Sequence, residues 1–337
     1  MNIFASSYIS GFDKLIEKSI KETYNDCQII NNFSGLIIYK TNQALKNMPF
    51  INNSYLVIDI KKCSNNNFND EVKKLFSSNL YDLKNAKQYI KNQKNFKILA
   101  FDKNLPTSLN YSIVKNIENN IKKDLNLKLG ERKHDVDFII NRRSENYLLF
   151  MLKLTYNRLT EKDIHQGSLK PELSYLMCKI ADIQETDVCM DMFCGSGSIP
   201  KQILKHFKYN MVFASDNNEN NIIALKKEFK NNNKKLYIKN RNALDLSYFN
   251  NDFIDKIITD PPWNMFNASN ENFVDFYAKS LSEIARILKP SGKAVILMGN
   301  IQEFELALKK QKQLKIIKTY HILVNGKKAN IYELIKS

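Results

Sequence analysis

The fold is decided by the stretch Asp187-Val188-Cys189-Met190-Asp191-Met192-Phe193-Cys194-Gly195-Ser196-Gly197-Ser198-Ile199. Its apolar first part predicts a short buried strand over residues 188–192. A turn with two glycines follows, and then Ser198 and Pro200 suit the N-cap and the first turn of a helix. Together these parts predict a site for a nucleotide-like ligand at the carboxyl end of a parallel strand. The two glycines would let the ligand approach the backbone closely.

The glycine turn alone has a second interpretation, a tight strand-to-helix turn without a ligand, because the dinucleotide fingerprint needs three glycines. A second stretch favours the ligand site: Ile257-Ile258-Thr259-Asp260-Pro261-Pro262-Trp263-Asn264. Here another apolar strand ends in a carboxylate, two prolines and an aromatic ring. The two stretches together resemble the S-adenosyl-L-methionine-dependent amino-methyltransferases. In that family the first motif holds the cofactor, and the Asp-Pro-Pro-aromatic motif holds an exocyclic base amine.

Strands and helices alternate from residue 187 onwards, which predicts a parallel sheet. The chain ends in two further strands around Asn325-Gly326, a strong hairpin signal. The predicted strands before that hairpin cover residues 188–192, 211–215, 236–239, 257–259 and 294–298. The resemblance implies an α/β fold: a class I, Rossmann-like methyltransferase domain with a mostly parallel seven-stranded sheet and a C-terminal antiparallel hairpin.

The first 155 residues contain no cofactor motif. Strand and helix patterns, with a polar break at Ser64-Asn65-Asn66-Asn67, predict two small α/β units. Their order resembles a ferredoxin-like domain followed by the THUMP domain of RNA-modifying enzymes. The implied domains are an N-terminal ferredoxin-like domain (1–65), a THUMP-like RNA-binding domain (66–155) and a catalytic domain (156–337). Residues 156–165 are expected to form the link.

The THUMP-like unit offers two basic surfaces. A helix is predicted from Ile113, Ile117, Ile121 and Leu125, which recur every four residues. Its other face and a hairpin tip carry the expected RNA-binding residues, which are Lys115, Lys122, Lys123, Arg142 and Arg143. An ordinary solvated face explains such lysines equally well. The net charge of +16 favours a nucleic-acid partner, although the excess of Lys over Arg is also what AT-rich codon usage produces.

The resemblance also assigns cofactor residues outside the glycine turn. The phrase Gly167-Ser168-Leu169-Lys170-Pro171 opens a helix, and its start would touch the methionine end of the cofactor. Asp216 ends the second strand, where a carboxylate can accept the ribose hydroxyls or cap a helix. Asn242 stands where the family usually has the Asp that binds the adenine amine, and Asp245 is a nearby substitute. The expected cofactor-binding residues are Ser168, Lys170, Pro171, Asp191, Phe193, Cys194, Gly195, Ser196, Gly197, Ser198, Asp216, Asn217, Asn242, Ala243 and Asp260.

The expected catalytic residues are Asp260, Pro261, Pro262 and Trp263. A base amine is flat and weakly nucleophilic because its lone pair is shared with the ring. Asp260 and the Pro261 carbonyl can each accept one amine hydrogen, which favours a pyramidal nitrogen with its lone pair aimed at the methyl group. The prolines fix the backbone in advance, and Trp263 offers a stacking face for a base taken out of its helix. The alternative is a rigid turn with a buried Trp and no ligand.

Composition excludes several classes of protein. No apolar run reaches the ~18 residues of a membrane span, and Met1-Asn2-Ile3-Phe4 does not begin a secretory signal. A cytoplasmic protein is therefore expected. Five scattered cysteines without a Cys-x-x-Cys pair argue against disulfides and zinc, so we expect no metal. Cys194 is expected to be a small apolar filler in the glycine turn.

The sequence as a whole predicts an S-adenosyl-L-methionine-dependent RNA methyltransferase that acts on an exocyclic base amine. By resemblance to the THUMP group of tRNA guanine-N2 methyltransferases, the preferred substrate is guanine in tRNA. That group usually carries Tyr-Gly after the prolines, where this chain has Trp263-Asn264. The alternatives are a guanine-N2 methyltransferase of rRNA, an adenine or cytosine amino-methyltransferase of DNA, and an RNA-binding protein with an inactive catalytic fold.

Overall fold

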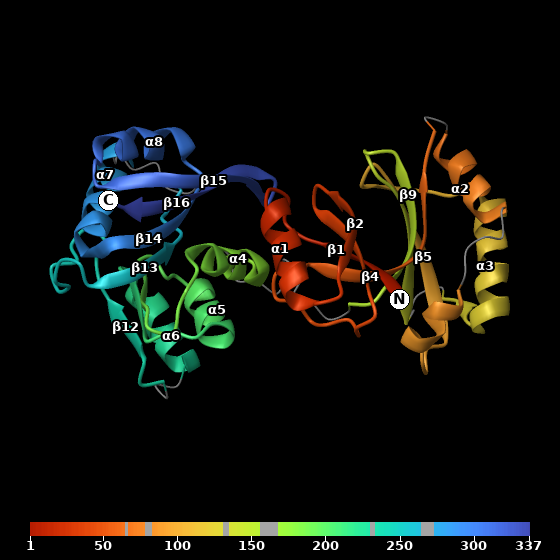
Figure 1. Ribbon diagram of the computed structural model, residues 1–337, viewed down its shortest axis with the longest axis horizontal. Coiled ribbons are helices and arrows are strands. Elements are labelled where there is room, and N and C mark those ends of the chain that lie inside the picture. The colour runs from red at the N-terminus through yellow and green to blue at the C-terminus, as the bar shows by residue number, and fades with distance from the viewer. Residues whose placement is uncertain (65–66, 78–82, 131–134, 156–167, 230–232, 264–272) are drawn as a thin grey trace. The chain divides into compact units, whose positions relative to one another are not determined.

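The computed structural model describes residues 1–64, 67–77, 83–130, 135–155, 168–229, 233–263 and 273–337. The chain forms two compact units, one of residues 1–8 and 12–158 and one of residues 9–11 and 159–337, each with its own sheet (Figure 1). The boundary expected at 65–66, the link at 156–165, and the predicted motif residues Gly167 and Asn264 lie outside the described ranges.

The described residues of the first unit form one sheet of nine strands and four helical segments. Its strands are β1 (Asn2–Ser7), β2 (Gln28–Phe33), β3 (Leu36–Thr41), β4 (Asn53–Lys62), β5 (Asn95–Asp102), β6 (Leu105–Thr107), β7 (Lys128–Leu129), β8 (Val136–Arg142) and β9 (Tyr147–Lys153). The helices are α1 (Asp13–Thr23), α2 (Phe68–Ser77), the 3₁₀ helix η1 (Lys84–Tyr89) and α3 (Tyr111–Leu125). The strand order is β2-β3-β1-β4-β9-β8-β5-β6, with β7 paired to β5.

The two small domains expected in this unit share that sheet. Strand β4 of the first pairs antiparallel with β9 of the second, from Tyr55 opposite Lys153 to Lys62 opposite Tyr147. Both strands are rich in apolar residues, so pairing them buries a common face, and one core cluster contains Ala5 from β1 together with Leu149 from β9. The polar break near residue 65 therefore does not separate two sheets.

The second unit has a seven-stranded sheet flanked by helices (Figure 1). Its strands are β10 (Val188–Asp191), β11 (Met211–Asp216), β12 (Leu236–Asn240), β13 (Ile254–Thr259), β14 (Leu288–Met298), β15 (Leu314–Val324) and β16 (Lys327–Lys336). The helices are α4 (Pro171–Ala181), α5 (Ser198–His206), α6 (Glu219–Phe229), α7 (Phe273–Ile287) and α8 (Ile301–Lys310). The strand order β12-β11-β10-β13-β14-β16-β15 confirms the predicted α/β class and its sheet.

Strand direction confirms the predicted mixture of parallel and antiparallel pairing. The strands from β12 to β14 pair in parallel, and β16 runs antiparallel to both β14 and β15. The hairpin turns at Asn325 and Gly326, whose φ angles of 49° and 79° suit a two-residue turn of the primed type. The hairpin expected from the Asn-Gly pair is thus present.

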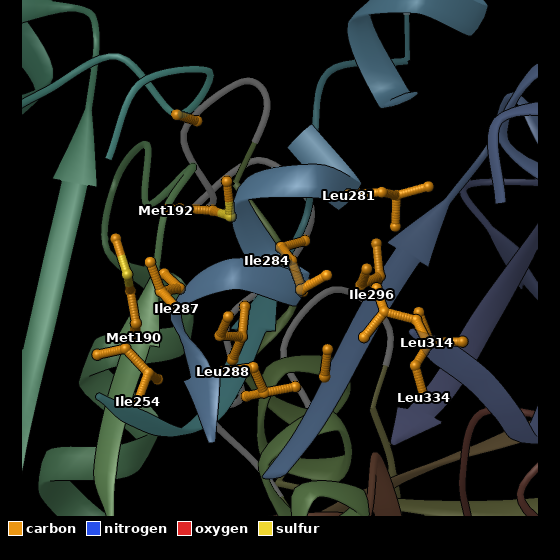
Figure 2. Close-up of a cluster of buried hydrophobic side chains, with 14 of the residues drawn as sticks. Met190, Met192, Ile254, Leu281, Ile284, Ile287, Leu288, Ile296, Leu314 and Leu334 are labelled. Carbon is orange, nitrogen blue, oxygen red and sulfur yellow. The ribbon is translucent and has the colours of Figure 1, made fainter. Parts of the chain in front are cut away.

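The order of the strands places the site. From β10 the chain moves outward to β11 on one side, and it later returns to β13 on the other side of β10. Ligands bind at such a reversal point, outside the carboxyl ends of the strands. Beneath it, the buried side chains of Met190, Ile254 and Ile296 from the sheet pack with Leu281 and Ile284 of α7 (Figure 2). This core holds the strand ends, and the loops that follow them, in fixed register.

Candidate functional site

The glycine turn between β10 and α5 is tied to the end of the neighbouring strand β11. The Cys194 N–H donates to the Ser215 carbonyl over 2.9 Å, and the Gly195 N–H donates to Oδ2 of Asp216, also over 2.9 Å. The turn and Asp216 were predicted to bind one ligand, and the structure brings them together. The Cys194 side chain is buried in a cluster with Ala214 and Leu225, as the filler interpretation expects.

The two glycines of the turn have different surroundings. Both have positive φ, 48° at Gly195 and 77° at Gly197. Among the described residues, a Cβ at Gly195 would meet no heavy atom within 4 Å, whereas a Cβ at Gly197 would lie 2.3 Å from Cδ1 of Leu225. Gly195 is therefore the position where a ligand can approach the backbone, while the space beside Gly197 is filled by α6 packing on the turn.

The start of α5 differs from the prediction by one residue. The helix begins at Ser198, so Gly197 occupies the cap position and no side chain caps the helix. The Ser198 hydroxyl instead lies 3.2 Å from that of Ser196. Ser168, just before α4, donates to the Ser196 hydroxyl over 2.7 Å. These three hydroxyls join the predicted pre-helix segment to the glycine turn.

The segment before α4 presents backbone and side chains at this edge of the unit. Lys170 occupies the cap position of α4 and Pro171 is its first residue, as the sequence predicts. Both side chains are half-buried. The hydrogen bond from Ser168 to Ser196 places this segment beside the glycine turn.

Asp216 organises the edge next to the turn. Besides Gly195, its carboxylate accepts from the Asn218 N–H over 2.9 Å and from the Asn221 amide over 3.2 Å, at the start of α6. Asp216 itself does not cap α6, because Asn218 does so: its side-chain oxygen accepts the Asn220 N–H over 3.0 Å. The carboxylate is only half-buried, and a carboxylate has about four acceptor sites, so the three contacts leave capacity for a ligand hydroxyl. Asn217 beside it is exposed.

The loop after β12 is hydrogen-bonded to the backbone of Asp216. The Arg241 N–H donates to the Asp216 carbonyl over 3.0 Å. Asn242 is exposed, and its side-chain oxygen accepts the Leu244 N–H over 3.0 Å. Ala243 is buried in the core, whereas Asp245 is exposed, and its bonds to Ser247 lower the pKa of its carboxyl. Asn242 and Asp245, the two polar residues expected to bind the adenine amine, are therefore both accessible to a ligand.

Asp191 is enclosed at the end of β10. Its Oδ1 accepts the Thr259 hydroxyl over 2.7 Å and the Phe193 N–H over 3.2 Å. Burial nevertheless dominates and raises the pKa of the carboxyl to about 7. The Phe193 N–H also reaches the Thr259 hydroxyl. Asp191, expected to bind the cofactor, therefore ties the ends of β10 and β13 together.

Asp260 follows β13 directly and belongs to a second polar cluster. Its Oδ1 accepts the indole N–H of Trp263 over 2.8 Å. The side chain is half-buried. The surrounding protein nevertheless desolvates the carboxyl and raises its pKa to about 8. The hydrogen bond from Trp263 lowers this pKa, whereas the negative charge of Asp191 raises it. Asp260, which is expected to accept an amine hydrogen, therefore has a carboxyl that changes charge at about pH 8.

The prolines and the ring of this motif are held by the core. Pro261 is buried, and the carbonyl of Pro262 accepts the Tyr277 hydroxyl over 2.8 Å. The half-buried Trp263 ring rests on Gly299, where an added Cβ would lie 2.3 Å from Cε3 of the indole. The motif is therefore clamped between α7 and the end of β14.

Sequence reasoning missed three residues that shape the site: Thr259, Tyr277 and Gly299. Thr259 carries a signal, since a polar residue ends an apolar strand just before Asp260. Gly299 also follows a predicted strand directly. Tyr277 carries no such signal in the sequence, because its hydroxyl reaches the Pro262 carbonyl only after α7 has packed against the sheet.

The predicted RNA-binding residues fall into two groups. Lys115, Lys122 and Lys123 are exposed on α3, and Lys115 forms an ion pair with Glu118 at 3.0 Å. Arg142 instead forms a two-pronged bond with Asp102, both arms at 2.7 Å, and its guanidinium lies over Phe68.

Arg143 is buried at the same hairpin. It donates to the Ser34 carbonyl over 2.8 Å, and it pairs with Glu145. The hairpin tip therefore presents less positive charge than the sequence predicts, because both arginines are used within the unit.

Among the described residues, no group of three or more His, Cys, Asp or Glu side chains could hold a metal ion. No helix in the described ranges is long and apolar enough to cross a membrane. The five cysteines are all free thiols, and Cys178, Cys189 and Cys194 are buried.

Comparison with known proteins finds methyltransferases. The methyltransferase small domain family matches residues 173–333. Human tRNA (guanine(6)-N(2))-methyltransferase THUMP3 is 27% identical over 221 residues, covering 60% of this chain and 43% of the relative. The mouse protein of that name is 28% identical over 52% of this chain and 37% of its own length. The chain thus spans less than half the length of the curated relatives it matches.

Solved structures share the fold over nearly the whole chain. TrmN from Thermus thermophilus superimposes with a TM-score of 0.81 at 15% identity, covering 100% of both chains. The putative methyltransferase SMU.472, solved in complex with SAH, gives 0.71 at 12% identity over 98% of this chain and 97% of its own. The family match and these neighbours agree with the methyltransferase fold expected from the sequence. The match to the methyltransferase small domain family covers the part of the second unit that carries the glycine turn and the Asp260 motif.

Proposed function

We propose that the chain is an S-adenosyl-L-methionine-dependent RNA methyltransferase that acts on an exocyclic base amine, with guanine N2 in tRNA as the preferred acceptor. One observation carries the proposal. The open glycine turn and the Asp260 motif follow adjacent parallel strands, β10 and β13, so a cofactor and an acceptor base can meet at one edge of the sheet.

The residues of the turn fit the cofactor. Gly195 leaves open space at the backbone, and the half-buried Asp216 carboxylate retains acceptor capacity for ribose hydroxyls. Asn242 or Asp245 would accept the adenine amine, and Ser168 and Ser196 would line the methionine end. When bound, S-adenosyl-L-methionine supplies a methyl group on a cationic sulfur with a neutral leaving group.

The Asp260 motif would prepare the acceptor. In its charged form Asp260 accepts one amine hydrogen, and the Pro261 carbonyl accepts the other, which localises the nitrogen lone pair. The prolines, together with the Tyr277 bond to Pro262, hold these acceptors in place before the base arrives. Trp263 would stack on the base, a contact worth about 1–3 kcal/mol.

The first unit would position the RNA. Exposed Lys122 and Lys123 on α3 suit phosphate contacts, which orient a nucleic acid without reading its bases. The THUMP-like order of elements supports RNA over DNA, and the names of the curated relatives support tRNA and guanine N2. A tRNA-modifying enzyme of this kind would act in the cytoplasm.

Methyl transfer by purified protein tests the proposal. We expect methyl incorporation into tRNA to exceed that into rRNA or duplex DNA. Asp260→Ala should abolish turnover and retain cofactor binding in calorimetry, because Asp260 serves the acceptor. Normal methylation by Asp260→Ala, or a preference for duplex DNA, would contradict the proposal.

A further inference from the structure

We propose that Trp263 is a positioning residue whose indole N–H fixes the orientation of the Asp260 carboxylate, and that Gly299 provides the room for this. The inference rests on the proposed function, because Asp260 is the group that would hold the acceptor amine. It assigns a role to the ring edge of Trp263 in addition to the stacking role of its face.

The geometry defines three parts of the indole. Its N–H donates to Oδ1 of Asp260 over 2.8 Å. The benzene ring lies on Gly299, where even a methyl group would collide with Cε3 and Cδ2. The stacking role in the proposed function is assigned to the other face of the ring. The base and the Asp260 carboxylate are thus served by different parts of one side chain.

Two anchors hold the indole in this position. Pro261 and Pro262 fix φ along the short path from Asp260 to Trp263. The Tyr277 hydroxyl holds the Pro262 carbonyl from α7 over 2.8 Å. Because Oδ1 is committed to the indole, Oδ2 is the oxygen assigned to the amine hydrogen.

The charged groups around Asp260 determine how loss of the N–H would act. Asp191 on β10 carries a like charge and raises the pKa of the Asp260 carboxyl, and the Trp263 bond opposes this. Tyr277 on α7 stays neutral, because burial raises its pKa to about 12. Removal of the indole N–H therefore raises the pKa of Asp260, and the charged carboxylate appears only at higher pH.

The chain has a single tryptophan, so its fluorescence reports this contact directly. We expect the emission of the full-length protein to titrate near pH 8, where Asp260 changes charge. Asp260→Asn should remove this transition. Gly299→Ala keeps both partners but displaces the ring, so it should also remove the transition. This readout needs neither RNA nor turnover, which separates failure of the inference from failure of the proposed function.

The pH dependence of methylation provides the second readout. Trp263→Phe keeps a stacking ring and loses the N–H. Its kcat/KM at pH 7 should fall about tenfold, the effect of one hydrogen bond to a charged group. In Trp263→Phe, the acid limb of the pH profile of kcat/KM should move to higher pH, while KM for RNA should stay nearly unchanged. Tyr332→Phe is the matched control, because it loses a hydrogen bond to Glu305 outside the Asp260 motif and should keep the limb in place.

A purely structural or stacking role makes different predictions. If Trp263→Phe leaves the acid limb in place and raises only KM for RNA, the indole N–H does not position Asp260. If the wild-type protein, Asp260→Asn and Gly299→Ala show the same emission at every pH, the indole does not contact Asp260 in solution. Either result overturns the inference.

Discussion

At Gly195 the backbone combines a φ of 48° with open space, whereas the equally unusual Gly197 is packed against Leu225. Gly195→Val should therefore fill the ligand space and lower cofactor affinity at least about tenfold, with a strain cost of roughly 1–3 kcal/mol. Gly326→Val is the matched control, since that residue also has positive φ and open surroundings but lies in the distant hairpin. Calorimetry and thermal melting separate the two effects. Equal cofactor affinity in both variants would argue against the turn as the cofactor site.

The two carboxyls Asp191 and Asp260 should make stability depend on pH in an unusual direction. Their pKa values rise from an ordinary 3.8 to about 7 and about 8 in the folded chain. The folded state therefore keeps protons that the unfolded state releases. Stability should fall as pH rises from about 4 to about 8, by up to roughly 1.4 kcal/mol per unit for each carboxyl.

Urea unfolding at several pH values measures this slope. Asp191→Asn, which removes the charge but keeps the shape, should flatten the slope between about pH 4 and 7. An identical slope in Asp191→Asn and the wild-type protein would show that Asp191 titrates normally.

At the scale of elements, the hairpin β8–β9 and the helix α3 should respond differently to mutation. Arg142 and its partner Asp102 are partly buried, and Arg142 holds the pKa of the Asp102 carboxyl below its usual value. Arg142→Ala should therefore cost about 2 kcal/mol of stability, less than a fully buried pair. The exposed pair Lys122 and Lys123, changed to Glu, should leave the melting temperature within a few degrees.

RNA binding should show the opposite pattern. Lys122→Glu with Lys123→Glu should weaken tRNA binding and reduce its salt dependence, because phosphate contacts are lost. Filter binding at several salt concentrations measures this, beside thermal melting of the same variants. Unchanged tRNA affinity in the double variant would remove α3 from the proposed RNA surface.

The elements that could be predicted are those encoded by local patterns. The isoleucine repeat predicts α3, and Asn325-Gly326 predicts the last hairpin, because both signals lie within a few residues. Strand β2 was missed, since its residues Gln28–Phe33 mix polar and apolar side chains without regular alternation. The pairing of β4 with β9 could not be predicted, because no local sequence pattern indicates which strands pair at the edges of two small sheets.

The residues of the site also divide into those that local motifs predict and those whose surroundings depend on distant parts of the chain. Gly195, Asp216 and Asp260 stand in motifs that a reader of the sequence can find. The burial of Asp191, and of Arg143 at the hairpin tip, depends on partners distant in the chain, Thr259 and Ser34. Such contacts exist only after packing, so the sequence predicts the residue but not whether it faces a ligand or the core.

At the scale of the whole molecule, the two units should divide the work. A fragment of residues 166–337 contains the complete seven-stranded sheet and the glycine turn. It should bind S-adenosyl-L-methionine with near-normal affinity and lose most activity on tRNA, because the lysines of α3 are missing. Calorimetry and methyl incorporation compare it with the full chain. Equal activity of fragment and full chain on tRNA would refute the division of labour.

The central claim is the identity of the methylated atom. The direct measurement is mass spectrometry of nucleosides from unmodified tRNA after incubation with S-adenosyl-L-methionine and the full chain, beside Asp260→Ala. We expect N2-methylguanosine with the wild-type chain and none with the variant. Methyladenosine or methylcytidine in place of N2-methylguanosine, or the same product from Asp260→Ala, would contradict it.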